Sequence, residues 1–362
     1  MKSKSMQSSA LETPDTSTKD GGKVEIIRDK DDRGMTPRNA LAGKIHRTHN
    51  STHPLIWDRW YNVHDMVNDA DDPLFFIALD CAQGPRELHI CGVSVDGRLF
   101  HTYRDSSSNF QNFFGDVEPF GEPQDEFLDV GCDFSFQNEL GEDPHNQFLN
   151  VFATTADLKV VHYQRETLSG WNFLGEITTD LDRLANKVTC ASLHPAYDVI
   201  WAAITGEVYR KHSSWSSPRR IHDNTLFGIK DVACHYLSMG NYNEDTILRI
   251  FAITNDGELL FRTSWKSGDK LSDWQDISHY IPGAAPLERV SASTLRLANG
   301  GFGTCLTVTD SNGQAMRITI DNAEVWRNSV VYLKSIYNVQ GRMIDVASPD
   351  SDETTEVLAI LG

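Results

Sequence analysis

The chain has 362 residues, and its 33 Lys and Arg against 51 Asp and Glu give a formal net charge of −18. Hydrophobic residues make up 40% and aromatic residues 10%, a composition typical of globular chains and too apolar for a disordered one. The acidic balance excludes nucleic acid and anionic membrane surfaces as expected partners, because both attract clustered lysine and arginine. No apolar run approaches the roughly 18 residues that a membrane-spanning helix needs.

The first 39 residues offer little that a core could bury. Ser, Thr, Lys and Asp dominate this segment, and it lacks the apolar stretch of a secretory signal peptide. We interpret residues 1–39 as a flexible polar arm outside the folded domain.

The six cysteines, at positions 81, 91, 132, 190, 234 and 305, show no CxxC spacing and no short His/Cys cluster. This pattern favours neither a zinc site nor a disulfide framework. Without a signal peptide, free thiols in a reducing cytoplasm are the simplest expectation. We therefore expect a cytoplasmic protein with no metal site.

A repeated unit of strand, turn and strand predicts the architecture. Four stretches align directly: LHICGVSVDGRLFHTYRDSSSNFQNF from Leu88, FLNVFATTADLKVVHYQRETLSGWNF from Phe148, YDVIWAAITGEVYRKHSSW from Tyr197 and ILRIFAITNDGELLFRTSW from Ile247. A weaker fifth copy begins at Gly303. Asn-Gly and Asp-Gly between alternating strands predict β-hairpins, because both residues tolerate positive φ. In the second copy Leu158 replaces the turn glycine, and we expect a different turn type there.

A further strand precedes each hairpin and repeats the pattern Val, any residue, small residue. It places Cys132, Cys190 and Cys234 at equivalent positions in three units. We expect these cysteines to be small buried side chains on crowded strands near a central axis, too far apart for disulfides.

The two ends of the chain complete each other. VLAILG, at residues 357–362, has the pattern of a first hairpin strand, and LAGKIHRTHN, from Leu41, supplies the matching turn and second strand. Their pairing would close a ring and remove the exposed edges of an open array. The six turn positions are 43, 97, 158, 206, 257 and 313, which leaves room for four short strands in each unit. We predict an all-β fold, a single six-bladed β-propeller of four-stranded blades over residues 40–362.

This ring of hairpins with a closing Trp resembles the fungal fucose-binding lectins of the Aleuria type, and DGRLFHTYRD from Asp96 resembles repeats of the Photorhabdus-type propeller lectins. The resemblance covers about residues 40–362 and implies sugar sites between blades. Each site would need an Arg on the first hairpin strand, a Glu four residues after the turn, and a stacking Trp. At the Glu position this chain has Arg47, His101, His162, Arg210, Phe261 and Arg317, and only Arg249 matches the lectin Arg. The resemblance thus implies the scaffold and not fucose specificity.

Two functions follow from a preserved ring that has lost this set of residues. The first is a cofactor-independent propeller that binds a small, largely apolar ligand and catalyses a cyclisation or cycloaddition. Lectin-like propellers occur among the fungal hetero-Diels–Alderases that join a tropolone quinone methide to a humulene-type sesquiterpene. The alternative is a lectin of altered, non-fucose specificity, and a protein-binding propeller is a third option. The expected partner is a small molecule or a glycan, with a homo-oligomer possible.

Candidate site residues fall into two groups. Four could donate hydrogen bonds or positive charge to a carbonyl or enolate oxygen, namely Arg47, His101, His162 and Arg210. Nine could line a ligand site, with packing between blades as the alternative for most of the Trp residues: Trp57, Tyr103, Tyr163, Trp171, Trp201, Trp215, Arg249, Phe261 and Trp265. Trp201 breaks the repeat, since our alignment places Gly92, Phe152 and Phe251 there, and we expect it to floor a pocket for a flat apolar ligand. Holding two partners in a reactive geometry would supply most of the acceleration.

Overall fold

The structure of the chain is a computed structural model. It describes residues 44–50, 61–63, 74–84, 87–105, 117–122, 125–136, 147–166, 170–178, 184–193, 196–223, 225–238, 246–264, 270–296, 302–320, 326–332, 343–348 and 355–361. The arm predicted for residues 1–39 lies outside these segments. Within them, no helix is long and apolar enough to cross a membrane.

The described strands form six antiparallel sheets of four strands each, which we call blades 1 to 6. Blade 1 contains β3 (Phe76–Gln83), β4 (Glu87–Ser94), β5 (Leu99–Asp105) and β6 (Glu118–Phe120). Blade 2 contains β7 (Phe127–Phe136), β8 (Gln147–Thr155), β9 (Val160–Glu166) and β10 (Gly170–Glu176). Blade 3 contains β11 (Ala185–Leu193), β12 (Ala196–Ala203), β13 (Val208–His212) and β14 (Arg219–His222).

Blade 4 contains β15 (Ile229–Ser238), β16 (Thr246–Thr254), β17 (Leu259–Ser264) and β18 (Gln275–Asp276). Blade 5 contains β19 (Leu287–Arg296), β20 (Phe302–Asp310), β21 (Ala315–Ile320) and β22 (Trp326–Tyr332). Blade 6 joins the two ends of the chain, with β23 (Met343–Ala347), β24 (Thr355–Leu361), β1 (Lys44–Asn50) and β2 (Tyr61–Asn62).

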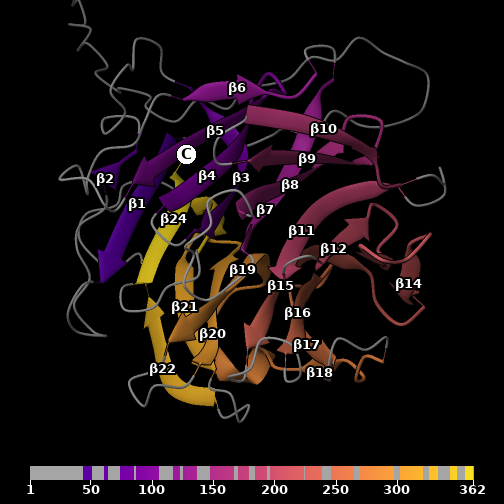
Figure 1. Ribbon diagram of the computed structural model, residues 1–362. Helices are drawn as coiled ribbons and strands as arrows, with labels where there is room; N and C mark the ends of the chain where they lie inside the picture. The colour runs from indigo at the N-terminus through magenta and orange to yellow at the C-terminus, as the bar shows by residue number, and fades with distance from the viewer. Residues whose placement is uncertain are drawn as a thin grey trace, which may run out of the picture.

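The blades surround a common axis, and the first strand of each blade contacts the first strand of the next (Figure 1). The series runs β3, β7, β11, β15, β19 and β23, and β23 returns to β3. This arrangement confirms the predicted six-bladed propeller.

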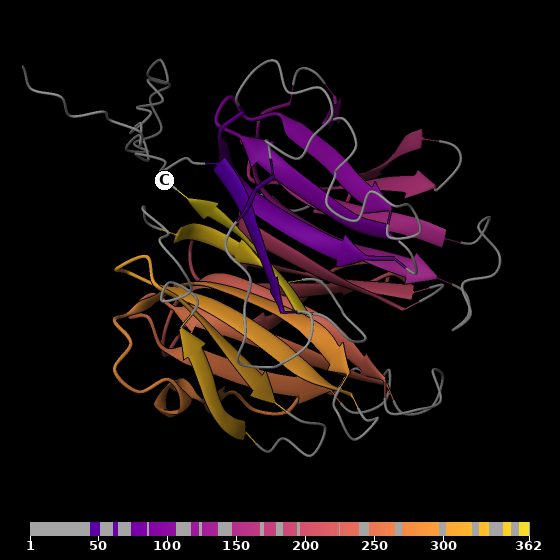
Figure 2. The same cartoon turned by 90° about the vertical axis from the view of Figure 1, so that its left-hand side faces the viewer.

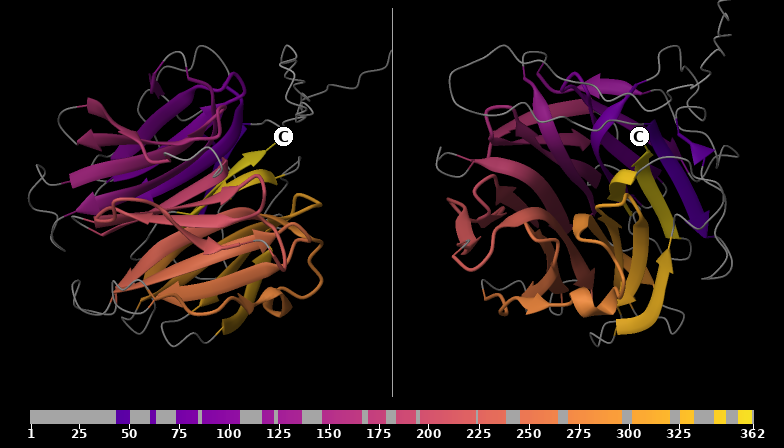
Figure 3. Two further views of the ribbon diagram at one scale, coloured as in Figure 1. Left: turned by 90° about the vertical axis from the view of Figure 1, so that its right-hand side faces the viewer. Right: turned by 180° about the vertical axis from the view of Figure 1, so that it is seen from behind.

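Pairing between β1 and β24 closes the ring. Every residue of β1 has a partner on β24, from Lys44 opposite Leu361 to Asn50 opposite Thr355. Figure 2 shows the indigo and yellow strands side by side, and Figure 3 shows the ring from its other sides. The predicted closure between the two chain ends is therefore confirmed, and blade 6 has no open edge at its second strand.

Turn chemistry follows the repeat more closely than we expected. Gly97, Gly206 and Gly257 have φ of 77°, 93° and 86°, in the left-handed region that glycine allows. Leu158 holds φ at 64°, and its N–H bonds to the Thr155 carbonyl as the other turn residues bond to theirs. The second hairpin thus keeps the common turn despite its leucine, and the expected change of turn type is wrong.

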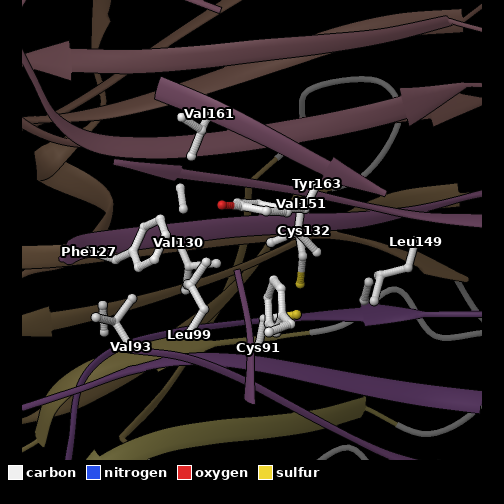
Figure 4. Packing of buried hydrophobic residues seen from close by; sticks show 14 of the residues in the cluster. Cys91, Val93, Leu99, Phe127, Val130, Cys132, Leu149, Val151, Val161 and Tyr163 are labelled. Atoms are coloured by element: carbon white, nitrogen blue, oxygen red, sulfur yellow. The ribbon is translucent and has the colours of Figure 1, made fainter. Parts of the chain in front are cut away.

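The core lies between the facing sheets of neighbouring blades. Figure 4 shows it at the first junction, where Val93 and Leu99 of blade 1 meet Phe127, Val130 and Val151 of blade 2. The structure gives all six cysteines as buried free thiols. As predicted, Cys132, Cys190 and Cys234 lie on the inner strands β7, β11 and β15. The cytoplasmic location remains a prediction.

The inner strands carry a ring of alternating charge at one repeated position. In blade order from blade 1 it reads Ala78, Asp129, Lys187, Asp231, Arg289 and Asp345. Each of the three Asp carboxylates accepts a backbone N–H from the next blade: Val188 at 2.8 Å, Val290 at 2.7 Å and Leu79 at 3.0 Å. Lys187 Nζ also lies 2.5 Å from Asp129 Oδ1. These contacts join blades in pairs around the axis.

Candidate functional site

In blades 1 to 5, the residue four positions after the hairpin turn faces the next blade and lies diagonally opposite the residue twelve positions before it. In four blades the two side chains bond directly to each other. The pairs are His89 Nδ1 with His101 Nε2 at 3.0 Å, Asn150 Oδ1 with His162 Nε2 at 3.1 Å, Asp198 with Arg210 at 2.7 and 2.9 Å, and Cys305 Sγ with Arg317 Nε at 2.9 Å. In these four blades, the positions that the lectin resemblance assigns to sugar binding are therefore occupied by residues that already bond to a partner within their own blade.

The first junction, between blades 1 and 2, holds the imidazole pair. His89 and His101 are 1% exposed, and their rings stack with centroids 5.3 Å apart. The Trp171 ring, from blade 2, packs edge-to-face against the His101 ring, with centroids 5.3 Å apart. Burial lowers the pKa of both imidazoles, and the positive charge of Arg165 lowers it further. The Glu87 carboxylate, 3.1 Å from His89 Nε2, raises the pKa of His89 but does not reverse the shift. Both rings are consequently neutral at pH 7, and they act as hydrogen-bonding groups and not as cations.

A cluster of aromatic residues, of which only Phe173 is exposed, borders this imidazole pair. We define the aromatic patch as Phe120, Tyr163, Trp171 and Phe173. Phe120 stacks on Trp171 with centroids 3.8 Å apart, and Tyr163 lies 5.8 Å from Phe120 and 5.2 Å from Phe173. Phe173 is 50% exposed on β10, and its exposed ring makes the patch accessible to a ligand. Such an apolar surface beside a few polar groups is typical of small-molecule sites.

Arg165 supplies a cation at the same junction. Its guanidinium lies 5.3 Å from the centroid of the half-buried Tyr103 ring, which belongs to blade 1. Arg165 faces Trp171 across the pairing of β9 with β10, so both side chains point toward blade 1. The first junction thus combines aromatic walls, neutral imidazoles, the positive charge of Arg165 and the carboxylate of Glu87.

The second junction, between blades 2 and 3, is closed. His162 is 2% exposed, with its ring 4.2 Å from Phe152 and 5.0 Å from Tyr197 of blade 3. Burial lowers its pKa to about 4. Its partner Asn150 also donates to Ser192 Oγ of blade 3 at 3.2 Å. These contacts make the His162 position a satisfied contact between blades.

The third junction, between blades 3 and 4, holds a buried ion pair. Arg210 and Asp198 are 2% and 0% exposed, and the Tyr236 hydroxyl of blade 4 donates to Asp198. The half-buried Trp215 ring lies 5.0 Å from the Arg210 guanidinium and 4.0 Å from that of Arg219. Because Asp198 neutralises Arg210, this arginine is less available to a ligand than the sequence predicted.

At the fourth junction, between blades 4 and 5, Arg249 and Phe261 are 0% and 3% exposed. Arg249 Nη1 donates to Thr304 Oγ1 at 2.8 Å, and His235 Nε2 lies 2.8 Å from the same hydroxyl. Arg249, the residue that matches the lectin Arg, therefore lies inside the contact between two blades.

The structure places the four candidate donor residues apart. His101, His162 and Arg210 face three different junctions, and the backbone of Arg47 belongs to β1 in blade 6, with its side chain outside the description. His101, His162 and Arg210 therefore cannot act together on one small ligand. Of the ligand-lining candidates, Tyr103, Tyr163 and Trp171 meet at the first junction, whereas Trp57 and Trp265 lie outside the described residues.

The alignment of Trp201 is right for Gly92 and wrong for Phe152 and Phe251. The strand register makes Trp201 equivalent to Gly92, Ala153 and Ala252, one position from the Phe152 and Phe251 of our alignment. Its side chain is fully buried in a cluster with Val188 and Tyr209. Trp201 thus fills the core between blades 2 and 3 and lies apart from both cavities described next.

The two best-defined cavities between described residues are small. One runs along the axis between the inner strands, with a volume of about 60 Å³, and the other lies between blades 6 and 1, with about 30 Å³. A small-molecule site needs roughly 300 Å³ or more, whereas one water needs only about 15 Å³. Neither cavity is therefore large enough for the small-molecule ligand that the sequence predicts.

Sequence reasoning missed several residues of these junctions. Phe120 and Phe173 lie on outer strands where the repeat is weakest, and His89, Asp198 and Tyr236 matter through contacts that depend on strand register. One signal was available, because a twelve-residue spacing separates each paired residue from the candidate after the turn.

The fold and junctions place the chain in the structural class of six-bladed, lectin-like β-propellers. Similar solved structures include the fucose-specific lectin from Aleuria aurantia, at 11% identity over 79% of this chain and 88% of the lectin, with a TM-score of 0.51. A triple mutant of AofleA from Arthrobotrys oligospora is 10% identical over 78% of this chain and 76% of that protein, with a TM-score of 0.50. The predicted resemblance is confirmed for the fold alone. No family model and no curated protein matches the chain.

Proposed function

We propose that the protein binds a small, largely apolar ligand at the rim of the first junction, on the aromatic patch. The observation that carries the proposal is the half-exposed Phe173 beside Trp171 and Phe120, in a junction whose polar pair is already satisfied. Burying aromatic surface contributes about 25 cal/mol per Å² of apolar area removed from water. A flat apolar ligand would gain this free energy without displacing an existing hydrogen bond.

We further propose that binding serves a cyclisation or cycloaddition of the hetero-Diels–Alder type. Such a reaction needs its two partners held in a reactive geometry, which is worth roughly 7–11 kcal/mol at the favourable extreme. Aromatic walls supply the positioning, and Arg165 is a cation suited to a carbonyl or enolate oxygen. His101 enters this proposal as a neutral hydrogen-bonding group, in contrast to the positively charged donor expected from the sequence.

The catalytic form is tested by incubating the protein with a tropolone quinone methide precursor and humulene and following the cycloadduct by mass spectrometry. We expect faster formation and one dominant stereoisomer, both reduced in the Trp171→Ala variant. The Trp215→Ala variant changes a Trp of another junction and serves as the control. A rate and isomer ratio equal to those without protein would contradict the catalytic proposal.

The alternative proposal is a glycan-binding protein of non-fucose specificity. It is favoured by the half-buried Trp171, an aromatic side chain next to polar groups, which suits the apolar face of a sugar ring. A glycan array distinguishes the two proposals. Micromolar binding to a glycan that is lost in Trp171→Ala, with no binding of humulene, would favour the lectin.

A further inference from the structure

The rim of the third junction differs in charge from the rest of this acidic chain. Residues 208–222, which include β13 and β14, contain Arg210, Lys211, Arg219 and Arg220 and no carboxylate, in a protein of net charge −18. The outer strands β6, β10 and β18 each carry an acidic residue, and β2 and β22 carry none. Among the described outer strands, β14 alone has two adjacent arginines, in the sequence Arg-Arg-Ile-His. This concentration of positive charge is local to blade 3.

Strand register places part of this charge toward blade 4. Arg219 lies opposite Arg210 in the pairing of β13 with β14, so both point to the side where Tyr236 of blade 4 bonds to Asp198. Arg220 lies opposite Tyr209 and points to the other side. Arg219 is exposed, and its guanidinium lies 4.0 Å from the Trp215 ring centroid. Stacking on an aromatic ring restricts the arginine and prepares its planar donors for an anion.

Blade 4 adds a third guanidinium to the same junction. Arg262 donates from Nη1 to the Ile221 carbonyl of β14 at 2.7 Å and from Nη2 to the Ser272 carbonyl at 2.7 Å. Its guanidinium also lies 4.9 Å from the Trp274 ring. Burial lowers the pKa of Arg262 to about 10, with the exposed Asp273 opposing the effect and Arg210 adding to it. Two arginines of neighbouring blades are thus held close enough to repel each other.

Donors in this junction remain unused. Among the described residues, Arg210 Nη1 and Arg262 Nε are buried without a hydrogen-bond partner. Arg210 is 2% exposed and Arg262 9%. An unpaired buried donor on a charged group is costly, and an oxyanion would satisfy it while relieving the repulsion between the arginines.

We propose that the rim of the third junction binds the oxyanion group of a small ligand, a carboxylate or a sulfate, with Arg219 in direct contact and with the unpaired Arg210 Nη1 and Arg262 Nε as the buried donors that the oxyanion satisfies. This site is separate from the aromatic patch and does not depend on the function proposed there. Trp215 and Trp274 flank it, so a ligand that carries its anion on a ring fits better than an inorganic ion alone.

The test measures the thermal unfolding midpoint against sulfate and against glucuronate, with ionic strength held constant by sodium chloride and with glucose as the neutral probe. Saturable stabilisation by both anions and none by glucose is expected. In Arg219→Gln the apparent dissociation constant should rise about tenfold or more, because a charge-assisted hydrogen bond is lost. Arg219→Lys keeps the charge but lacks the planar guanidinium. Its apparent dissociation constant should lie between those of the original protein and Arg219→Gln.

Arg220→Gln is the matched control. It removes the same charge from the adjacent residue, which points to the other side of the strand and acts on Asp223. Its anion affinity should stay within about twofold of the original, which is the effect of general charge alone. If anion affinity falls equally in Arg219→Gln and Arg220→Gln, the effect is one of general charge and the proposed site is wrong. An absence of saturable stabilisation by the anions would also contradict the site. Humulene binding should be unchanged in Arg219→Gln, which separates this test from that of the aromatic patch.

Discussion

Leu158 is the residue at which the repeat and its local chemistry disagree. It holds φ at 64° in a turn where the other hairpins place glycine, and a left-handed conformation costs a non-glycine residue about 1–2 kcal/mol. Surrounding contacts hold it there, including the Ala185 N–H bond to its carbonyl at 2.8 Å. The strain is therefore balanced by the pairing of blade 2 with the start of blade 3.

Replacing Leu158 with glycine should stabilise the protein. We expect the free energy of unfolding to rise by about 1 kcal/mol, since the strain removed exceeds the chain entropy that glycine adds. Urea unfolding at pH 7.5 measures the change. Gly206→Ala is the control and should lower the free energy of unfolding. Gly206 has φ of 93°, and an added Cβ would lie 2.7 Å from Gly228 Cα. A destabilised Leu158→Gly variant would contradict this explanation of the turn.

Arg210 lies in a buried ion pair, and its removal should show a structural role. Arg210→Met leaves Asp198 charged and buried, which is expected to cost about 3–5 kcal/mol of unfolding free energy. The double variant Asp198→Leu with Arg210→Met should recover a large part of this loss, because no unpaired charge remains. Chemical denaturation of the three proteins tests the pair. A loss below about 1 kcal/mol in the single variant would mean that solvent reaches the pair, as at a surface salt bridge.

Among the elements, β24 carries the closure of the ring. It pairs with β1 on one side and with β23 on the other. Within blade 6, the last described strand of the chain thus joins the first described strand. Leu358 is 0% exposed on this strand and packs in a cluster that includes Ile45 and Phe100. The C-terminal strand is thus a central part of the core between blades 6 and 1.

Truncating Leu358 to alanine should cost about 2–5 kcal/mol, as for other buried leucines. Leu361, on the same strand and only partly buried, provides the control, and Leu361→Ala should cost clearly less. Calorimetry on both variants makes the comparison. Equal, small effects would indicate that β24 is not required for closure.

How far the elements could be predicted depended on the range of the contact involved. Turn glycines and alternating strands are local features, so the hairpins and the closure by β1 and β24 were predictable. Trp201 was aligned with residues one position away in two other copies because alignment cannot fix strand register, whereas pairing with Tyr209 does. The pairs across each hairpin were missed for the same reason. The outer strand β10, with its exposed Phe173, has almost no pattern of its own.

At the scale of the whole molecule, buried charges around the axis make stability depend on pH in two directions. Burial raises the pKa of Asp80 and Asp231 to about 7 from 3.8. Their contribution to stability is present below pH 3.8 and is lost as pH rises through about 7. Burial lowers the pKa of His162 to about 4 and of His235 to about 3. The histidine contribution is present above pH 6.5 and is lost as pH falls through those values.

Asp231→Asn should separate these two effects. At pH 8 the folded protein holds Asp231 as a buried carboxylate, so the neutral amide should raise the free energy of unfolding. At pH 5 Asp231 is already protonated in the folded state, and the advantage of the amide should shrink. Denaturant unfolding at both pH values measures this difference. An advantage that grows as pH falls would contradict the raised pKa of Asp231.

For the whole molecule, we predict that one junction of six binds an apolar ligand, although all six share one scaffold. Titrating humulene into the protein and recording tryptophan fluorescence, with Phe173→Ala and its neighbour Leu174→Ala compared, tests this most directly. Leu174 is 53% exposed and Phe173 50%. Phe173 belongs to the aromatic patch, with its ring 5.2 Å from Tyr163, whereas Leu174 is outside the patch. We predict that Phe173→Ala weakens binding about tenfold, as expected for loss of a contacting aromatic ring, while Leu174→Ala leaves it unchanged. Equal affinity in the two variants, or no saturable binding to the original protein, would contradict the assignment of the aromatic patch as the ligand site.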